Sequence, residues 1–527
     1  MKTLKAHQKS TQKSQLEKNI KRKPVYRASA IFPIYHSSEY STKILFMGYW
    51  MVKRQIKEVG LLLTLRNQNG EIIFRRNEVI SQIKAYNYEV GVIGKTYMTE
   101  LGFSELQGSL ELEIFSTRDL VFPYPAFVVC YYNDIFSSVV HTTGRVYNDI
   151  EDLKETNERE VEESGFDIVS TKEINPFFSF VNGPLENNSP KIGITLLNKN
   201  NTDIHDVVDL PAIKPYESVS INISKLINLS SLNHSRGSVS IKHNFRGFFP
   251  RFIAGNIRNT EKKILSITHT YYNCSTCFEE SDYRPRKDSN YNDASVLIPI
   301  FIIADKFTEL VLYPIFSPSS YTLSFDFYTR DGENIFSIDK YKTISKDSKS
   351  HEFINFNGLL KNVDRQNEIV SARINTNWIG VRIPTRLKFA LNVGQSKNVN
   401  FPCNICFAPK LGDPRVDLKP STFRWLPLLN ISKSVAVIYN SSPQKVYKRN
   451  AQVNIKIYRE KDEKFLEYNE VIQPFGQIKF ELFKNDEILD FLNNKSGWLT
   501  CKADNPHVNT WYFDFSDSGA VAGDHGF

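Results

Sequence analysis

The chain contains little methionine and cysteine, with 4 and 6 residues among 527. It also has no apolar run long enough to cross a bilayer, because the longest candidate, residues 296–304, is interrupted by Pro299 and ends before Asp305. No apolar segment follows the basic N-terminal residues as it would in a signal peptide. We therefore expect no transmembrane segment and a cytoplasmic location by default. A non-standard export route and a virion are the alternatives.

Signatures of common enzymes are also absent from the sequence. It has no GxSxG, no Walker A motif, no dinucleotide-binding glycine pattern and no HExxH. We find no nucleic-acid-binding module, and the body of the chain has no excess of basic residues that would line a nucleic-acid groove. A non-catalytic multidomain binding or scaffold protein is therefore the first interpretation.

The net charge of +8 lies in the N-terminal segment. Residues 1–27 contain nine Lys or Arg and one Glu, which leaves 57 basic and 57 acidic residues in the rest of the chain. Such a segment is typically a solvated, disordered tail. The functional alternative is an electrostatic tether to an anionic surface, to RNA or to an acidic partner. The acidic residues of 149–167 could also neutralise this tail within the chain.

Aromatic residues are plentiful, with 37 Phe and 25 Tyr, and they favour half-buried strands. Two such runs, residues 59–66 and 71–74, flank the Asn/Gly turn at 67–70 and predict a hairpin. Residues 108–114 alternate between apolar and polar side chains, as a strand with one buried face does.

Similar segments recur along the chain. A proline precedes a strand at Pro125, Pro250 and Pro384, with Thr510 in the fourth place, at intervals of 125, 134 and 126 residues. Each interval holds enough residues for a separate core. The pattern predicts an all-β fold: a tandem array of four immunoglobulin-like or jelly-roll-like β-sandwich units with short helices. The cysteine–tryptophan–cysteine pattern of true immunoglobulin domains is missing, so this comparison concerns architecture alone.

The expected boundaries follow from these recurrences and from the polar stretches between them. They are a basic tail at 1–24, unit one at 25–148, an acidic linker at 149–165, unit two at 166–278, a linker at 279–293, unit three at 294–408, a linker at 409–421 and unit four at 422–527.

Two CxxC pairs are the clearest chemical motif: Cys274 with Cys277, and Cys403 with Cys406. Each pair stands beside a Phe, so we place them at equivalent ends of units two and three. Four thiolates would complete a tetrahedral zinc site if those ends meet. Ordinary buried cysteines inherited by duplication are the alternative, and a redox pair is a third reading. Zinc is thus a possible cofactor.

Histidine recurs near the ends of three units, at His141, His269 and His525, and we expect Asn398 at that place in unit three. The structural interpretation is a strand-end corner in which the imidazole bonds backbone groups. The chemical interpretation makes His269 a metal ligand, or makes His525 a base held by Asp524. The candidate catalytic residues are His141, His269, Asp524 and His525.

Aromatic residues beside the recurrent prolines are the candidate binding residues. They are Tyr124, Phe127, Phe249, Phe252 and Trp511. Exposed aromatic rings suit sugar rings or partner strands, so we expect a glycan or protein partner, such as a cell-envelope or virion component. Core packing is the alternative for each ring. The second functional hypothesis is a metal-dependent or His-based enzyme that acts on a carbohydrate or related polymer at the junctions between repeats.

Removal of residues 1–24 should leave the body folded, because this segment adds charge and almost no apolar surface to bury. If the segment is a tether, truncation should also weaken binding to anionic vesicles or RNA in a salt-dependent manner. Thermal melting and vesicle sedimentation measure the two effects. A large fall in melting temperature would show that the segment packs on the body.

Overall fold

The computed structural model of the chain describes most of the sequence. The described residues are 3–6, 8–9, 25–120, 125–141, 144–146, 162–198, 200, 202–249, 251–260, 263–272, 283–284, 289–313, 319–346, 348, 351–380, 383–384, 387–429 and 433–527. Strands make up 54% of the chain and helices 12%, which confirms the prediction of an all-β protein with short helices. The described helices include none that is long and apolar enough to span a membrane.

We group the strands into four consecutive sets and call them sandwich one to sandwich four. Sandwich one contains β1 (Tyr26–His36), β2 (Ser41–Met47), α2 (Tyr49–Arg54), β3 (Val59–Asn67), β4 (Ile72–Ile80), β5 (Ala85–Glu89), α3 (Val90–Ile93), α4 (Lys95–Leu101), β6 (Leu106–Ser116), β7 (Val128–Tyr132), β8 (Ser137–His141) and β9 (Arg145–Val146). Sandwich two contains β10 (Glu162–Val169), β11 (Ile174–Val181), β12 (Lys191–Asn198), β13 (Asp203–Asp209), β14 (Ser218–Asn222), η1 (Ile223–Lys225), η2 (Ser230–Leu232), β15 (Arg236–His243), β16 (Phe248–Phe249), β17 (Ile253–Arg258), β18 (Ile264–His269) and β19 (Tyr271–Tyr272).

Sandwich three and sandwich four follow in the same way. Sandwich three contains β20 (Tyr283–Arg284), β21 (Ala294–Pro299), β22 (Lys306–Leu312), β23 (Ser320–Tyr328), β24 (Asn334–Ile344), β25 (Glu352–Asn355), α6 (Phe356–Leu360), η4 (Gln366–Glu368), β26 (Ser371–Ile379), β27 (Ile383–Pro384), β28 (Phe389–Gln395), η5 (Ser396–Asn398), β29 (Cys403–Phe407) and β30 (Lys410–Leu411). Sandwich four contains α7 (Pro414–Asp417), β31 (Thr422–Leu428), β32 (Ser434–Asn440), β33 (Ala451–Arg459), β34 (Phe465–Ile472), β35 (Gln477–Glu481), η6 (Leu482–Lys484), α8 (Asp486–Leu492), β36 (Gly497–Ala503), β37 (Val508–Phe515) and β38 (Val521–His525).

The pairing order of the strands is the same in all four sandwiches. The outer sheets run β4-β3-β6-β1, β13-β12-β15-β10, β24-β23-β26-β21 and β34-β33-β36-β31. The inner sheets run β5-β2-β7-β8, β14-β11-β17-β18, β25-β22-β28-β29 and β35-β32-β37-β38. In sandwich one the pair His36–Ser41 joins the two sheets into one. An immunoglobulin domain pairs its first strand with its second, whereas here the first strand pairs with the sixth, so the immunoglobulin comparison does not extend to strand order.

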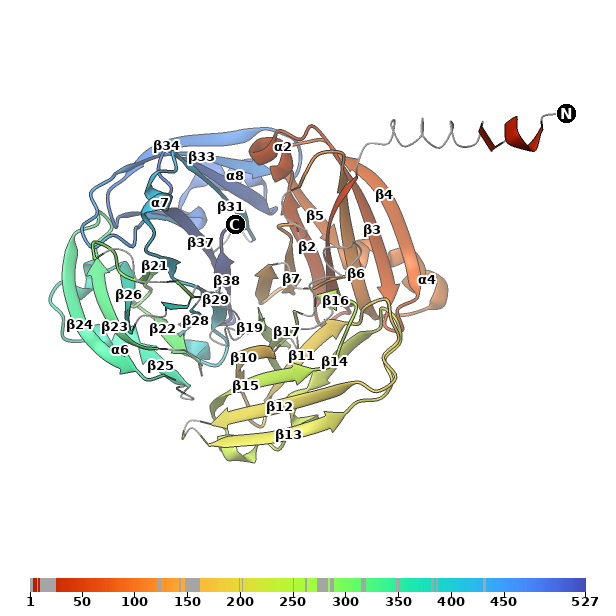
Figure 1. Cartoon of the computed structure of the whole chain (residues 1–527), viewed down its shortest axis with the longest axis horizontal. Helices are drawn as coiled ribbons and strands as arrows, with labels where there is room; N and C mark the ends of the chain where they lie inside the picture. Colours follow the sequence, from red (N-terminus) through yellow and green to blue (C-terminus); the bar gives the residue numbers. More distant parts are fainter. Residues whose placement is uncertain are drawn as a thin grey trace.

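The four sandwiches form a ring (Figure 1). The last strand of each inner sheet lies near the centre, where β8 contacts β18, β18 contacts β29, β29 contacts β38, and β38 contacts β8. The outer strands β4, β13, β24 and β34 lie at the rim (Figure 1). The predicted hairpin of residues 59–74 is confirmed as β3 paired with β4.

Apolar cores lie between the two sheets of each sandwich and continue across some junctions. One cluster joins sandwich one to sandwich four and includes Trp50 and Trp498. A second cluster joins sandwich three to sandwich four, with Phe325 and Trp511 among its members. Sandwich two contributes Ile253 and Ile267 to the first cluster, and other side chains of this sandwich form a separate cluster around Phe178. Burial of apolar surface therefore holds the ring together as well as each sandwich.

Two junctions of the ring are built alike. The β3–β4 hairpin of sandwich one lies on the turn before β14 of sandwich two, where Ser218 N donates to Gln68 O at 2.9 Å. The β23–β24 hairpin of sandwich three lies in the same way on sandwich four, where Gln477 N donates to Arg330 O, also at 2.9 Å. Sandwiches one and two together therefore correspond to sandwiches three and four.

Sequence similarity supports this pairing of the sandwiches. Residues 67–74 read Asn-Gln-Asn-Gly-Glu-Ile-Ile-Phe, and residues 329–336 read Thr-Arg-Asp-Gly-Glu-Asn-Ile-Phe. Asn182 in sandwich two donates its side-chain amide to the carbonyl groups of Ile213 and Lys214. Asn440 in sandwich four donates to the corresponding carbonyls of Ile472 and Gln473. The repeat is thus strongest between two-sandwich blocks.

Gly332 is required at the second of these junctions. Its φ is +85°, and an added Cβ would lie 2.1 Å from Pro474 O. Gly332→Ala should therefore separate the hairpin from sandwich four. Gly102 also has a positive φ, +67°, but an added Cβ there would meet no atom within 4 Å, so Gly102→Ala is a control for backbone strain alone.

We expect Gly102→Ala to lower the free energy of unfolding by about 1 kcal/mol, and Gly332→Ala by at least about 1 kcal/mol more. Urea unfolding followed by tryptophan fluorescence measures both. Equal losses for the two variants would mean that the hairpin contact adds nothing to stability.

Candidate functional site

The candidate site lies where the inner strands end at the centre of the ring. His141, His269 and His525 are the last residues of β8, β18 and β38, and they pair with the first part of β7, β17 and β37. By the same register, Phe407 occupies this place in sandwich three, opposite Phe389. The expectation of Asn398 was wrong, because that residue lies in η5, before β29 begins.

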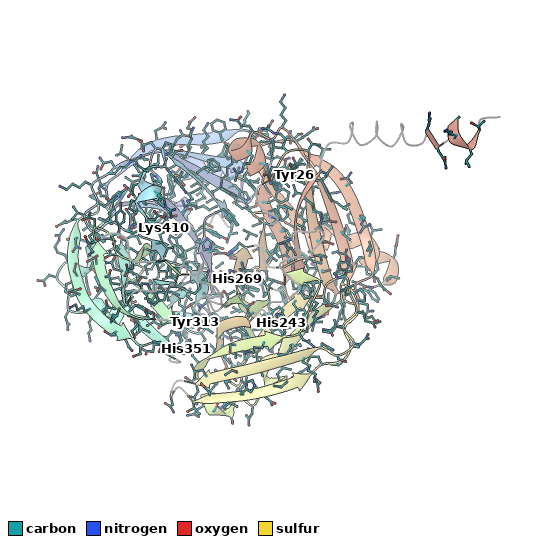
Figure 2. The ribbon with its side chains drawn as sticks, in the orientation of Figure 1. Tyr26, His243, His269, Tyr313, His351 and Lys410 are labelled. Atoms are coloured by element: carbon teal, nitrogen blue, oxygen red, sulfur yellow. The ribbon has the colours of Figure 1, made fainter. Side chains whose placement is uncertain are left out.

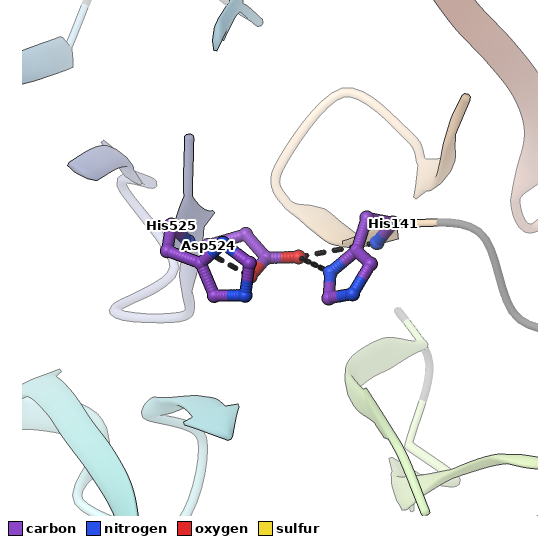
Figure 3. A group of neighbouring side chains, drawn as sticks. All are labelled: His141, Asp524 and His525. Carbon is purple, nitrogen blue, oxygen red and sulfur yellow. Dashed lines mark hydrogen bonds and ion pairs between the residues drawn. The ribbon is translucent and has the colours of Figure 1, made fainter. Parts of the chain in front are cut away.

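We call His141, His269, Asp524 and His525 the hub cluster. Asp524 lies at its middle: its Oδ2 accepts hydrogen bonds from Nδ1 of His141 at 2.8 Å and from the backbone N–H of His141 at 3.1 Å (Figure 3). Its Oδ1 accepts the backbone N–H of His525 at 2.8 Å. The ring closure therefore brings together the candidate catalytic residues of units one and four.

His269 and His525 bond the backbone just beyond their strands. Nδ1 of His269 lies 2.7 Å from Thr270 O, and Nδ1 of His525 lies 3.1 Å from Gly526 O. A carbonyl oxygen can only accept, so Nδ1 carries the proton in both rings and Nε2 keeps its lone pair. The ring of His141 lies 4.7 Å from that of His269 and 4.9 Å from that of His525. Figure 2 places His269 near the centre of the molecule.

Burial and neighbouring charges shift the pKa values of three members of the hub cluster: His269, Asp524 and His525. Burial lowers the pKa of His269 well below its usual value, and the charges of Arg251 and His141 lower it further. Burial also lowers the pKa of His525. Burial alone would raise the pKa of Asp524, but His141 and His525 hold it below its usual value. A buried carboxylate thus lies among imidazoles, of which His269 and His525 are neutral.

The cluster can support two kinds of chemistry. The contact between a carboxylate and Nδ1–H of His141 orients that imidazole and leaves Nε2 as a possible base. Alternatively, His141, Asp524 and His525 can offer one donor atom each to a metal, since these atoms lie within 4.8 Å of one another. The structural interpretation of the recurrent histidines also applies to His269 and His525, because each imidazole forms a hydrogen bond with a backbone carbonyl at the end of its strand.

The two CxxC motifs stand at different places relative to the strands of their sandwiches. Cys403 and Cys406 lie within β29, whereas the counterpart strand β18 ends at His269, before Cys274. The two motifs are therefore not equivalent, and that part of the prediction was wrong. Cys274 and Cys277 lie outside the described residues.

Cys403 and Cys406 also point to opposite faces of β29, because residues three apart in a strand do so. Cys403 packs with the cluster of sandwiches three and four, while Cys406 packs beside Val311 and Ala390. Burial raises the pKa of Cys403 to about 12. A buried, protonated thiol that points away from Cys406 fits the interpretation of Cys403 as a core residue.

The aromatic binding candidates are core residues where their side chains are described. Phe127, Phe252 and Trp511 are buried, so the interpretation of these three rings as exposed contacts was wrong. The backbone of Phe249 lies in β16, and Tyr124 lies outside the described residues.

A buried polar site between sandwiches two and three was missed by the sequence analysis. Asp167 accepts from Nε2 of His351 at 2.8 Å and from the amides of Asn392 and Asn404 at 3.3 Å, and Arg236 lies 3.5 Å away. The expected boundaries place Asp167 in unit two, with no role assigned to it. Its position in β10 between the apolar residues Phe166 and Ile168 was the signal in the sequence for a buried strand.

A cavity of about 450 Å³ lies between sandwiches one and four, beside the start of β8 at Ser137. Its lining includes Lys43, Lys433 and Asp514. Burial raises the pKa of Asp514 to about 6, although hydrogen bonds from the hydroxyls of Ser137 and Ser434 oppose that rise. This carboxyl group is therefore partly protonated near neutral pH.

Comparison of the sequence with protein families and curated proteins identifies no relative. No protein-family model matches the sequence, and no curated protein matches it significantly.

The raised pKa of Asp514 predicts a pH effect on stability. Its folded pKa of about 6 exceeds the usual 3.8, so ionisation costs more in the folded protein. The contribution of Asp514 to the free energy of unfolding should fall as the pH rises from about 4 to about 6, by about 3 kcal/mol in total. Above pH 6 it should stay constant.

Asp514→Asn keeps the shape of the protonated acid and should stabilise the protein above pH 6 relative to wild type, with no gain at pH 4. Urea unfolding from pH 4 to pH 7.5 measures this difference. Asp517→Asn, an exposed change of equal charge in the same cavity, is the control. A constant difference between Asp514→Asn and wild type at all pH values would contradict the assignment.

Proposed function

We propose that this chain is a non-catalytic scaffold or binding protein built from four duplicated β-sandwich domains. Their proposed limits are residues 25–148, 166–278, 294–408 and 422–527. The observation that carries the proposal is the meeting of β8, β18, β29 and β38 at the centre, which closes the four sandwiches into one ring. A closed ring is suited to holding binding surfaces at constant separations.

Contacts at the junctions support a rigid platform. Between sandwiches one and four, the rings of Tyr49 and Trp425 stack at 4.6 Å, and Ser137 donates to Asp514 at 2.6 Å. Between sandwiches two and three, Arg236 pairs with Glu309 at 2.8 Å. Buried stacking and charge-assisted bonds of this kind resist movement between domains.

The rim supplies candidate binding surfaces. The strands β4, β13, β24 and β34 are each last in the order of an outer sheet, so one edge of each is unpaired among the described strands. Apolar side chains are exposed there, such as Val79 at 62% and Val207 at 58%. Strand edges bind extended segments of partner proteins by adding a strand to the sheet.

A protein partner, such as a cell-envelope or virion component, is therefore favoured over a glycan. The glycan proposal rested on exposed aromatic rings, and Phe127, Phe252 and Trp511 are buried. The alternative function, a His-based or metal-dependent enzyme acting on a carbohydrate polymer, is supported by the contact between His141 and Asp524 in the hub cluster.

One experiment separates these functions. Purified protein is tested for binding to glycan arrays and to envelope or virion fractions of its source, and for turnover of chromogenic glycosides. We expect binding to a protein component that falls at least about tenfold, 1.4 kcal/mol, when Val79→Lys and Val207→Lys are combined. Leu418→Lys, which changes an 83% exposed residue away from the strand edges, is the control.

Asp524→Asn should leave this binding unchanged. Glycoside turnover that Asp524→Asn abolishes would overturn the scaffold proposal in favour of the enzyme. Binding that the rim variants do not alter would reject the strand edges as the contact.

A further inference from the structure

The hub cluster has a composition that the scaffold function does not require. A ring could close at its centre with apolar side chains alone, as Phe407 does in sandwich three, where it packs on Trp511 at 5.6 Å. In sandwiches one and four, the same place holds two imidazoles and a buried carboxylate instead. Burial of a carboxylate is costly unless the charge is compensated.

We propose that the hub cluster binds one divalent transition-metal ion of the zinc type through His141, Asp524 and His525. Their donor atoms lie within 4.8 Å of one another. Two ligands of a tetrahedral zinc ion stand about 3.4 Å apart when each is about 2.1 Å from the metal. Small rotations of these side chains therefore suffice to reach that geometry. The proposal is independent of the scaffold function.

The ion would replace a proton at a contact that already exists. Nδ1 of His141 and Oδ2 of Asp524 are 2.8 Å apart with a shared hydrogen, and they separate by about 0.6 Å to accept a zinc ion between them. The displaced proton of a neutral His141 moves to its Nε2, so the imidazole remains neutral and Nδ1 becomes the ligand atom. Asp524 supplies the negative charge that a divalent cation requires.

His525 provides the third ligand atom. Its Nε2 lies 4.0 Å from Oδ1 of Asp524, and its Nδ1–H is donated to Gly526 O. A metal-binding histidine usually donates its other N–H to a carbonyl or carboxylate, which fixes the ring and its tautomer. His525 thus has the support that a ligand histidine needs before any metal arrives.

The fourth position is left to water, and His269 limits access to it. The His269 ring stands edge-on to His141, with an interplanar angle of 84°. Since His269 is neutral, it adds no positive charge beside the ion. Arg251 and Lys388 do act on the cluster from nearby, and they should weaken the affinity relative to a site with no cations.

Bound metal would join β8 of sandwich one to β38 of sandwich four. These strands are distant in the sequence but adjacent in the ring. An ion that binds only when both are in place stabilises the closed ring. The bound ion would therefore cross-link sandwich one to sandwich four at the junction between them.

The test uses the full-length protein freed of metal by chelation and titrated with Co²⁺ and Zn²⁺. We expect one equivalent of Co²⁺ with the visible absorption of a four-coordinate ion, no thiolate-to-cobalt charge-transfer band, and a higher melting temperature with Zn²⁺. His525→Gln and Asp524→Asn should each weaken binding at least tenfold. His525 is 35% exposed, so its replacement should not prevent folding.

His351→Gln is the matched control, because His351 and Asp167 also form a 2.8 Å buried contact, but among the described residues they belong to no group of three potential metal ligands. This variant should bind Co²⁺ as wild type does. A wild type that binds no stoichiometric metal would overturn the proposal. So would retention of binding in both His525→Gln and Asp524→Asn, or a charge-transfer band that assigns the metal to cysteines.

Discussion

The packing of β8, β18, β29 and β38 around one axis is the constraint on which the ring depends. Four strands can approach this closely only if their facing side chains are small or form hydrogen bonds with the neighbouring strands. Serine meets both conditions: Ser138 Oγ accepts the backbone N–H of Ile267 at 2.8 Å, and Ser266 Oγ donates to Pro402 O at 2.6 Å. Each bond links neighbouring sandwiches, so ring closure itself provides the hydrogen-bond partners of these two hydroxyl groups.

The same constraint accounts for the different fates of the recurrent histidines. At the end of β18 and β38 the imidazole bonds the carbonyl that follows, as a strand-end corner would. His141 departs from this pattern because Asp524 from sandwich four lies within reach of its Nδ1. One residue type in one topological position therefore has two roles, and the neighbouring sandwich decides which.

Local features of the fold were predictable from the sequence, because they depend on residues close in the chain. The Asn/Gly turn at 67–70 predicted the β3–β4 hairpin, and the alternation at 108–114 predicted β6. It was harder to predict which residues occupy equivalent positions in different repeats, because this depends on strand register and not on distance along the chain. The CxxC motifs share a spacing, yet β29 contains Cys403 while β18 ends five residues before Cys274.

The candidate site was predictable in part for the same reason. Recurrence singled out His141, His269 and His525, and their neighbour Asp524, without showing which of them meet. The aromatic rings of Phe127 and Trp511 were assigned wrongly because a strand residue beside a turn can face either side, and only the second sheet decides. The two-sandwich block was visible in the sequence as the motif at 67–74 repeated at 329–336, but a search for four equal copies does not reveal it.

The relation between the two blocks has a consequence for assembly. A shorter chain of one block would present an unsatisfied face on each of its two sandwiches. Two copies of such a chain could close around a two-fold axis, with each second sandwich meeting the first sandwich of the other subunit. In the present chain the corresponding interfaces have different chemistry: charged pairs at Arg236 on one side and the Tyr49–Trp425 stack on the other. Joining both halves in one polypeptide permits such asymmetry, which a symmetric dimer could not have.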